Sequence, residues 1–274
     1  MCLNVSYKLK TIDTNVPIPH EVLVYIENAI LRYSVGLVVL DSRDDFLCAA
    51  SGTFVCLRDC PAILTARHVI DKIKHNLGLA LGNYTHKFIL ERFCLEFKSA
   101  PKGETEASGP DLGLIYINGP KVDTIKAIKS FCNLDSYGDS ICKEATIPKT
   151  GGWAVFGIPE ELSQIESLQK LAGRVVLAPG PDYSVRDGYD YFVFDFRPDP
   201  PSCVPSSLAG MSGGGVWHVR LLQHPHSNEV YVPRDSDWLT LSGVVYYQSP
   251  IIDGGRSLYT HGRKSVYKKL YEWA

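Results

Sequence analysis

Short β-rich segments, broken by turn residues, set the strongest limit on how this 274-residue chain can fold. Clear examples are YSVGLVVLD, GTFVCL and YDYFVFDFR, which begin at Tyr33, Gly52 and Tyr189. Strands that recur at short intervals, without alternating helices, favour antiparallel sandwiches or barrels over a doubly wound parallel sheet. The other expected strands share this composition; they cover 62–66, 87–97, 112–117, 153–158, 174–178, 215–221, 229–232 and 239–247.

Helical periodicity is confined to three segments. Apolar residues recur at helical spacing in 19–32, which begins with a proline, and in 159–171, where Gly173 is a plausible stop signal. A shorter segment, 265–273, predicts a C-terminal helix. We interpret each apolar stripe as a surface that packs on the sheets.

Charge and composition exclude several classes of protein. The net charge is −2, which gives no strong attraction to nucleic acid or to an anionic membrane. The longest clean apolar stretches, such as Val35–Leu40, are too short to span a bilayer, and the first residues have no apolar core of a secretory signal. These features, with eight cysteines and no CxxC pair, predict a cytoplasmic protein with reduced thiols.

Two groups of residues have side chains that can bind a metal, but both also fit ordinary surface or core positions. Cys48, Cys56 and Cys60 fit no common zinc spacing. The histidines 218, 224 and 226 fall in a segment that is typical of a solvated hairpin. We therefore predict neither a metal site nor a cofactor.

Three short motifs carry the candidate chemistry. In Gly210-Met211-Ser212-Gly213-Gly214-Gly215, a serine stands among glycines, where a tight turn can expose its hydroxyl and direct neighbouring amides to one point. His68 follows the β-rich run that ends in LTAR, and Asp111 stands at the start of the run DLGLI. Each alone is commonly structural, but they occur in the order His, Asp, Ser, separated by 43 and 101 residues.

With these motifs the sequence resembles the trypsin-like (chymotrypsin-fold) serine peptidases. The matching segments are SGTFV from Ser51, LTARHV from Leu64, DLGLI from Asp111, GMSGGGVW from Gly210 and LSGVVYY from Leu241. The resemblance implies a catalytic triad of His68, Asp111 and Ser212, and an oxyanion hole made by the backbone amides of Gly210 and Ser212. No metal or organic cofactor is needed for this chemistry.

The resemblance also predicts a substrate pocket and marks departures from the family. The pocket floor is expected near Ser206 and its wall at Tyr246, Tyr247 and Gln248, although the two tyrosines could equally be packed within a strand. The floor has no acidic residue, so a tryptic preference for Arg or Lys is not expected. Met211 replaces the aspartate that pairs with a released N-terminus in secreted members, and no IVGG-like segment is found near the chain start. We therefore expect that N-terminal cleavage is not needed for activity, and that intracellular branches of the family are closer.

The predicted architecture is all-β, with two antiparallel β-barrels of the chymotrypsin type, an N-terminal helix and a C-terminal helix. We assign 1–32 to an N-terminal extension and helix, and 33–274 to the peptidase domain. Within the domain, the first barrel covers about 33–134, the second about 146–257 and the C-terminal helix about 263–273.

The predicted function is limited intracellular proteolysis of protein or peptide substrates through an acyl-enzyme. A regulatory protein partner is left open, and neither nucleic acid nor membrane is expected as a partner. One alternative is a catalytically silent trypsin-like binding module. The other is an α/β-hydrolase, in which Asp253 and His261 would follow the serine. The few residues after Ser212, and strands that do not alternate with helices, disfavour the hydrolase.

Overall fold

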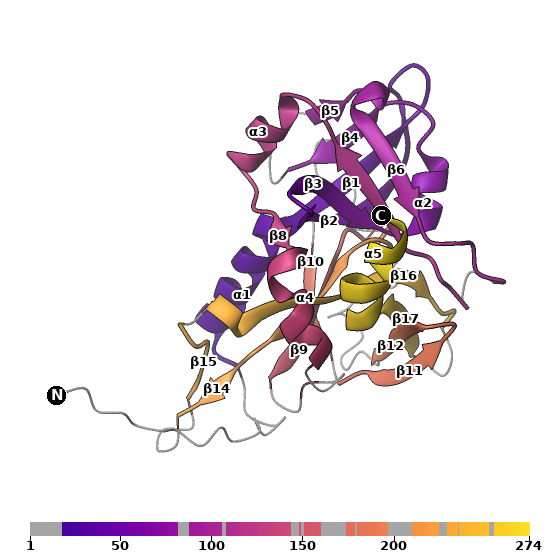
Figure 1. The fold of residues 1–274 in the computed structure, drawn as a ribbon. Helices are drawn as coiled ribbons and strands as arrows, with labels where there is room; N and C mark the ends of the chain where they lie inside the picture. Colours follow the sequence, from indigo (N-terminus) through magenta and orange to yellow (C-terminus); the bar gives the residue numbers. More distant parts are fainter. Residues whose placement is uncertain are drawn as a thin grey trace.

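The computed structural model describes residues 18–81, 88–105, 108–143, 148, 151–159, 174–178, 180–196, 210–224, 229–234, 236–251 and 255–274. Two mainly antiparallel sheets form the molecule, and Figure 1 shows the earlier strands in one layer and the later strands in the other. In this part of the chain, no helix is both long and apolar enough to cross a membrane.

The first sheet has eight strands, from β1 to β8. They are β1 (Ser34–Leu40), β2 (Phe46–Leu57), β3 (Cys60–Thr65), β4 (Leu77–Ala80), β5 (Phe88–Leu90), β6 (Leu95–Ser99), β7 (Gly113–Ile117) and β8 (Cys132–Asn133). Their order is β5-β4-β1-β2-β3-β7-β6, and β8 adds a short parallel pairing with β2. Every residue of β1 is buried, and the strand pairs with β2 on one side and β4 on the other.

The second sheet has seven strands in the order β10-β9-β13-β16-β17-β12-β11. They are β9 (Gly152–Gly157), β10 (Arg174–Ala178), β11 (Asp182–Arg186), β12 (Tyr189–Phe196), β13 (Gly215–Val219), β16 (Leu239–Gln248) and β17 (Arg256–His261), with a hairpin of β14 (Leu222–Gln223) and β15 (Val230–Tyr231) beside them. Because β10 at one end also contacts β12 near the other, the sheet curls back on itself. The all-β, antiparallel fold class is thereby confirmed.

Helices occupy the two ends of the chain and the connections of the first sheet. They are α1 (His20–Tyr33), α2 (Arg67–Lys72), α3 (Lys121–Lys126), α4 (Leu134–Lys143) and α5 (Leu270–Trp273), with the helical turns η1 (Arg92–Cys94), η5 (Ser236–Trp238) and η6 (Ser265–Lys269). The N-terminal and C-terminal helices are confirmed. The helix expected over 159–171 lies, apart from Pro159, outside the described residues.

One expected strand is divided in the structure, and the strands β4, β11 and β17 and the helices α3 and α4 were not predicted from the sequence. The run 87–97 is not one strand, because η1 divides β5, which pairs with β4, from β6, which pairs with β7. The helix α3 is only six residues long, and α4 carries the internal sequence SYGDS. Glycine and short polar residues weaken helical periodicity, and packing of Leu134 and Ile141 in the core stabilises α4 instead.

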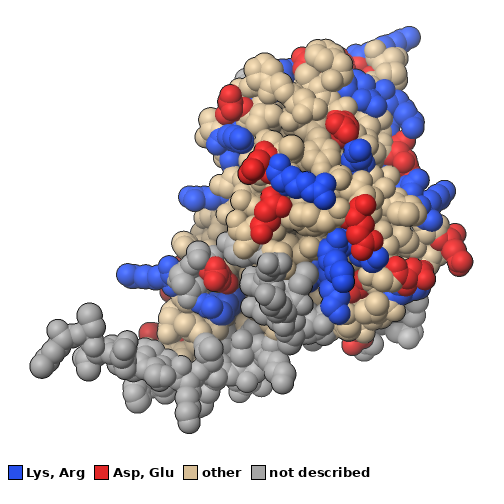
Figure 2. Space-filling view, viewed as in Figure 1, with Lys and Arg blue, Asp and Glu red and all other residues tan. Residues whose placement is uncertain are grey.

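Charged residues of both signs are dispersed over the visible surface. On the face drawn in Figure 2, lysines and arginines alternate with aspartates and glutamates over the described elements. This distribution agrees with the net charge of −2.

A buried aspartate attaches the C-terminal helix to the second sheet. Asp190 of β12 is fully buried, and its carboxylate accepts hydrogen bonds from the backbone N–H groups of Lys264 (3.0 Å) and Ser265 (2.6 Å) and from Ser265 Oγ (2.8 Å). The first N–H groups of a helix have no partner within the helix, so a carboxylate at this place stabilises its start.

We predict that Asp190→Ala lowers the free energy of unfolding by roughly 3 kcal/mol, because it leaves buried N–H and O–H donors without an acceptor. Asp195→Ala, on the exposed face of the same strand, is the matched control and is expected to have little effect. Urea unfolding of the two variants checks this. Equal midpoints would contradict the role of Asp190.

Candidate active site

The register of two neighbouring strands brings His68 and Asp111 together. Antiparallel pairing places Thr65, at the end of β3, opposite Gly113, at the start of β7. Residues that follow β3 and residues that precede β7 therefore lie side by side at the same edge of the sheet. His68 lies in the first turn of α2 after β3, and Asp111 lies just before β7.

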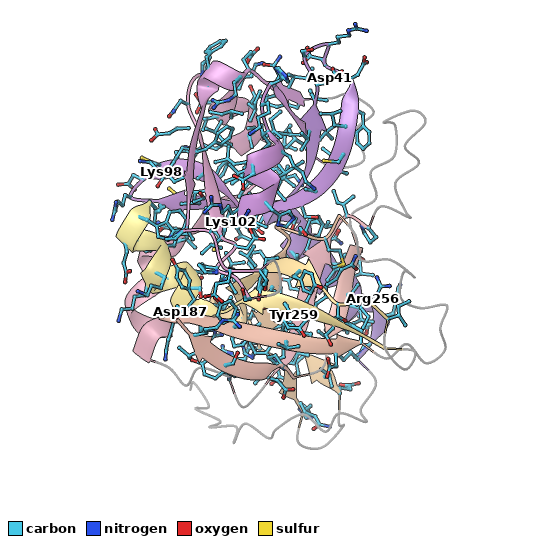
Figure 3. The ribbon with its side chains drawn as sticks, turned by 90° about the vertical axis from the view of Figure 1, so that its right-hand side faces the viewer. Asp41, Lys98, Lys102, Asp187, Arg256 and Tyr259 are labelled. Atoms are coloured by element: carbon cyan, nitrogen blue, oxygen red, sulfur yellow. The ribbon has the colours of Figure 1, made fainter. Side chains whose placement is uncertain are left out.

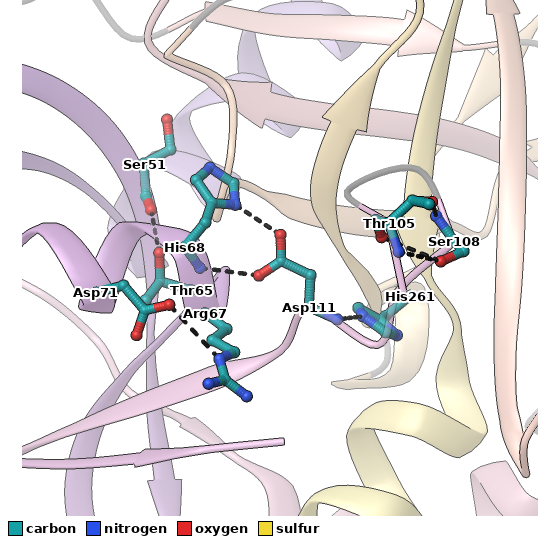
Figure 4. Close-up of polar contacts among 9 residues, drawn as sticks. All are labelled: Ser51, Thr65, Arg67, His68, Asp71, Thr105, Ser108, Asp111 and His261. Carbon is teal, nitrogen blue, oxygen red and sulfur yellow. Dashed lines mark hydrogen bonds and ion pairs between the residues drawn. The ribbon is translucent and has the colours of Figure 1, made fainter. Parts of the chain in front are cut away.

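Both oxygens of the Asp111 carboxylate bind His68 (Figure 4). The ring Nδ1 lies 2.6 Å from Oδ2, and the backbone N–H of His68 donates to Oδ1 at 2.9 Å. The Asp111 side chain is 12% exposed, whereas the His68 side chain is 35% exposed. An ionised carboxylate accepts hydrogen bonds only, so this contact places the proton of a neutral imidazole on Nδ1 and leaves Nε2 as a base.

A second histidine lies behind Asp111. The backbone N–H of Asp111 donates to Nε2 of His261 at 2.9 Å (Figure 4). His261 is fully buried, and the rings of Tyr189, Tyr191 and Tyr246 lie 5.8, 5.1 and 4.9 Å from its own. Burial lowers the pKa of His261 to about 3, which outweighs the opposite effect of Asp111, so the ring is a neutral acceptor at ordinary pH.

This placement corrects the α/β-hydrolase alternative. That fold needs a parallel central sheet, whereas both main sheets here are antiparallel apart from the short β2–β8 pairing. His261 supports the backbone of Asp111 and is not part of the cavity lining described below. Asp253 lies outside the described residues. Sequence reasoning missed the contact with Asp111 because 150 residues separate the two partners.

Ser212 lies in a turn, Gly210–Gly214, that we call the serine turn. Gly210 and Gly213 have φ angles of +88° and +89°, a conformation that side chains disfavour. A Cβ atom on Gly213 would overlap the carbonyl oxygen of Ser51 and Oγ1 of Thr65. The turn is closed by a hydrogen bond from Gly214 N to Met211 O at 2.9 Å. The glycines therefore have the conformational role that the sequence predicted.

A cavity of about 360 Å³ brings most of the predicted site residues together. Its lining includes seven of them: His68, Asp111, Gly210, Ser212, Tyr246, Tyr247 and Gln248. The eighth, Ser206, lies outside the described residues. The structure has no hydrogen bond between the described side chains of Ser212 and His68; the His68 ring bonds to Asp111.

The predicted wall residues Tyr246, Tyr247 and Gln248 differ in exposure and in the contacts that they already make. Tyr246 is only 2% exposed and packs against the rings of both Tyr191 and His261, and burial raises its pKa well above the ordinary value. Tyr247 is partly buried against Tyr259, and Gln248 Oε1 accepts a hydrogen bond from Arg256 Nη1 at 2.8 Å. Tyr246 therefore borders the cavity as a core residue, while Tyr247 and Gln248 border it as partly exposed residues.

Two further cavities show that volume alone does not identify the candidate site. One of about 300 Å³ is also lined by His68 and Asp111 and includes Lys102, which Figure 3 places where the two sheets meet. The other, of about 530 Å³, lies against α1 and β13 and contains none of the predicted site residues. The cavity at Ser212, which is intermediate in volume among the three, is thus the candidate active site because of its side chains.

The alternatives with metal-ligating residues find no support in the described geometry. Across the described ranges, no three His, Cys, Asp or Glu side chains form a group that could hold a metal ion. Cys48, Cys56 and Cys60 form no disulfide. His218 is buried with its ring 5.2 Å from that of Trp153, and His226 lies outside the described residues.

Met211 is fully buried in an apolar cluster of the second sheet that includes Trp153, Val155 and Phe192. The fit is close, since a Cβ atom on Gly157 would overlap the side chain of Met211. A charged group would be strongly unfavourable in these surroundings.

No family model and no curated protein matches the chain. Solved structures that match include the crystal structure of protease Anisep from Arthrobacter nicotinovorans, with 12% sequence identity and a TM-score of 0.47. The match covers 87% of this chain and 94% of that protease. At this distance no activity is carried over from that protein.

We predict that His261→Gln makes the protein less sensitive to acid. In the wild type, unfolding raises the pKa of His261 from about 3 to its ordinary 6.5, so the unfolded chain takes up a proton as the pH falls through this window. The free energy of unfolding therefore falls as the pH drops from 6.5 to about 3, by up to about 1.4 kcal/mol per pH unit. Glutamine keeps an acceptor for Asp111 without titrating.

Urea unfolding at a series of pH values checks this prediction. Plotted against pH, the free energies of unfolding of wild type and variant should have different slopes between the two pKa values of His261 and run parallel at neutral pH. Parallel curves throughout would show that His261 is not held neutral by the fold.

Proposed function

We propose that this protein is a serine endopeptidase that uses Ser212 as nucleophile, His68 as general base and acid, and Asp111 to orient His68. The observation that supports this most directly is the double contact of Asp111 with His68, beside a cavity that Ser212 shares. A serine hydroxyl is a weak nucleophile until a neighbouring base accepts its proton. A histidine whose other nitrogen is bound to a carboxylate is suited to that role.

The reaction follows from these positions. Ser212 Oγ attacks the carbonyl carbon of a peptide bond, and its proton passes to Nε2 of His68, whose positive charge Asp111 stabilises. The imidazolium then gives that proton to the amine nitrogen as the C–N bond breaks, which leaves an acyl-enzyme. Water attacks the ester, again with His68 as base, and the acid product leaves while Ser212 recovers its proton.

Charge on the carbonyl oxygen is stabilised in this proposal by the amides of Gly210 and Ser212. Backbone N–H groups that are fixed before the reaction are effective, because no reorganisation is needed when the charge develops. The positive φ of Gly210 fits a turn that must direct the amides of Gly210 and Ser212 to one point.

The substrate class is a protein or peptide, cleaved by limited proteolysis in the cytoplasm. Among the described lining residues the only acidic group is Asp111, which His68 already engages, while Lys72 adds a positive charge. A preference for Arg or Lys at the cleavage site is therefore disfavoured. The alternative, a silent binding module, shares the fold and is separated from the proposal by reactivity at Ser212.

We predict that a fluorophosphonate probe labels the wild type at Ser212. Ser212→Ala should abolish labelling, and His68→Ala should slow it by about 10³-fold or more, because the hydroxyl loses its base. Ser257→Ala, a serine of β17 that donates to Asp195, is the control and should react like wild type. Peptide mapping by mass spectrometry identifies the labelled residue. A folded wild type that does not react would favour the silent binding module.

We also predict that the full 274-residue chain reacts without N-terminal cleavage. Met211 is buried among apolar side chains and provides no anion for a released ammonium group. Intact-mass measurement of the labelled protein should show the full chain with one probe attached. If only chains shortened at the N-terminus carried the probe, activation by cleavage would be established instead.

A further inference from the structure

Ser51 occupies the junction between the two sheets, directly against the serine turn. It lies in β2 of the first sheet and is fully buried. Its Oγ donates to the carbonyl oxygen of Gly210 at 2.8 Å and accepts from the backbone N–H of Ile158 at 2.9 Å. Its backbone N–H donates to the carbonyl oxygen of Ser212 at 2.9 Å. One residue of the first sheet thus holds two carbonyls of a turn in the second.

These contacts fix the part of the turn on which the chemistry depends. Each peptide unit is planar, so holding the carbonyl of Gly210 also fixes the N–H of Met211, and holding the carbonyl of Ser212 also fixes the N–H of Gly213. The Ser212 amide lies between these two planes, and Gly210 begins the held segment. A turn rich in glycine has wide conformational freedom when it lacks such contacts.

The same residue connects the turn to the strand that leads to the base. Oγ1 of Thr65, the last residue of β3, donates to the carbonyl oxygen of Ser51 at 2.9 Å (Figure 4). His68 follows three residues later at the start of α2. Ser51 therefore touches both the support of the base and the turn that carries the nucleophile.

We propose that Ser51 is a positioning residue that, through its hydroxyl, holds the serine turn in the orientation needed for catalysis. Met211 is buried without charge, so the turn is not ordered by an ion pair at that position. The hydroxyl of Ser51, itself held by Ile158, supplies a neutral clamp from the opposite sheet. This inference rests on the proposed function and adds a pre-formed site to it.

The test compares Ser51→Ala with Ser242→Ala. Ser242 is a matched control in β16, because it is also fully buried, donates to a carbonyl (Thr240 O, 3.1 Å) and accepts from an N–H (Arg263 Nε, 3.0 Å). Loss of the clamp should slow fluorophosphonate labelling by about 10²-fold, as expected when donors to the reacting oxygen are displaced. With a peptide substrate, kcat should fall while KM changes little. Ser242→Ala should leave the labelling rate and kcat close to those of the wild type.

Amide hydrogen exchange gives a second readout that does not need activity. Exchange over Gly210–Gly214 should accelerate in Ser51→Ala and stay unchanged in Ser242→Ala. Wild-type rates of both labelling and exchange in Ser51→Ala would overturn the proposal. If the wild type itself does not react, the proposed function fails, and exchange alone decides whether Ser51 holds the turn.

A milder variant covers the case in which Ser51→Ala does not fold. Ser51→Cys keeps a weak donor and acceptor at the same place. It should label at an intermediate rate and show intermediate exchange in the serine turn. Labelling and exchange equal to wild type would contradict a role for the hydroxyl.

Discussion

The carboxylate of Asp111 is the group around which the candidate site is arranged. Its two oxygens accept hydrogen bonds from the ring and the backbone N–H of His68. The backbone N–H of Asp111 donates to the ring of His261. Burial of the carboxylate strengthens these contacts, because an exposed ion pair is screened by water and contributes little. The first sheet provides the carboxylate and the base, while β17 of the second sheet provides the histidine that supports them.

The two sheets depend on each other for the site. Ser212 belongs to the second sheet, and its turn is held by Ser51 of the first. Neither sheet alone provides both Ser212 and His68, the proposed nucleophile and its proposed base. Small displacements between the sheets would therefore change the approach of Ser212 to His68 more than they would change either sheet, since packed interiors transmit strain over such junctions.

Local signals in the sequence were informative wherever a contact depends on a turn or on neighbouring strands. The glycines of GMSGGG indicated a tight turn, and positive φ angles at Gly210 and Gly213 agree with it. The β-rich runs beside His68 and Asp111 placed both residues at strand ends, where register joins them. Signals failed where a polar break divided a strand, as at η1, and where core packing outweighed weak periodicity, as in α4.

The sequence by itself determined the antiparallel β class, the two terminal helices and the identity of the serine, histidine and aspartate candidates. These follow from patterns within a few residues, because turn chemistry and strand alternation act locally. Only the tertiary structure decided that His261 supports Asp111 and that Ser51 holds the serine turn. Both contacts join residues 150 or more positions apart, and both involve neutral side chains that are common in buried strands. Such pairs have no local signature, because the packing of the two sheets alone brings them together.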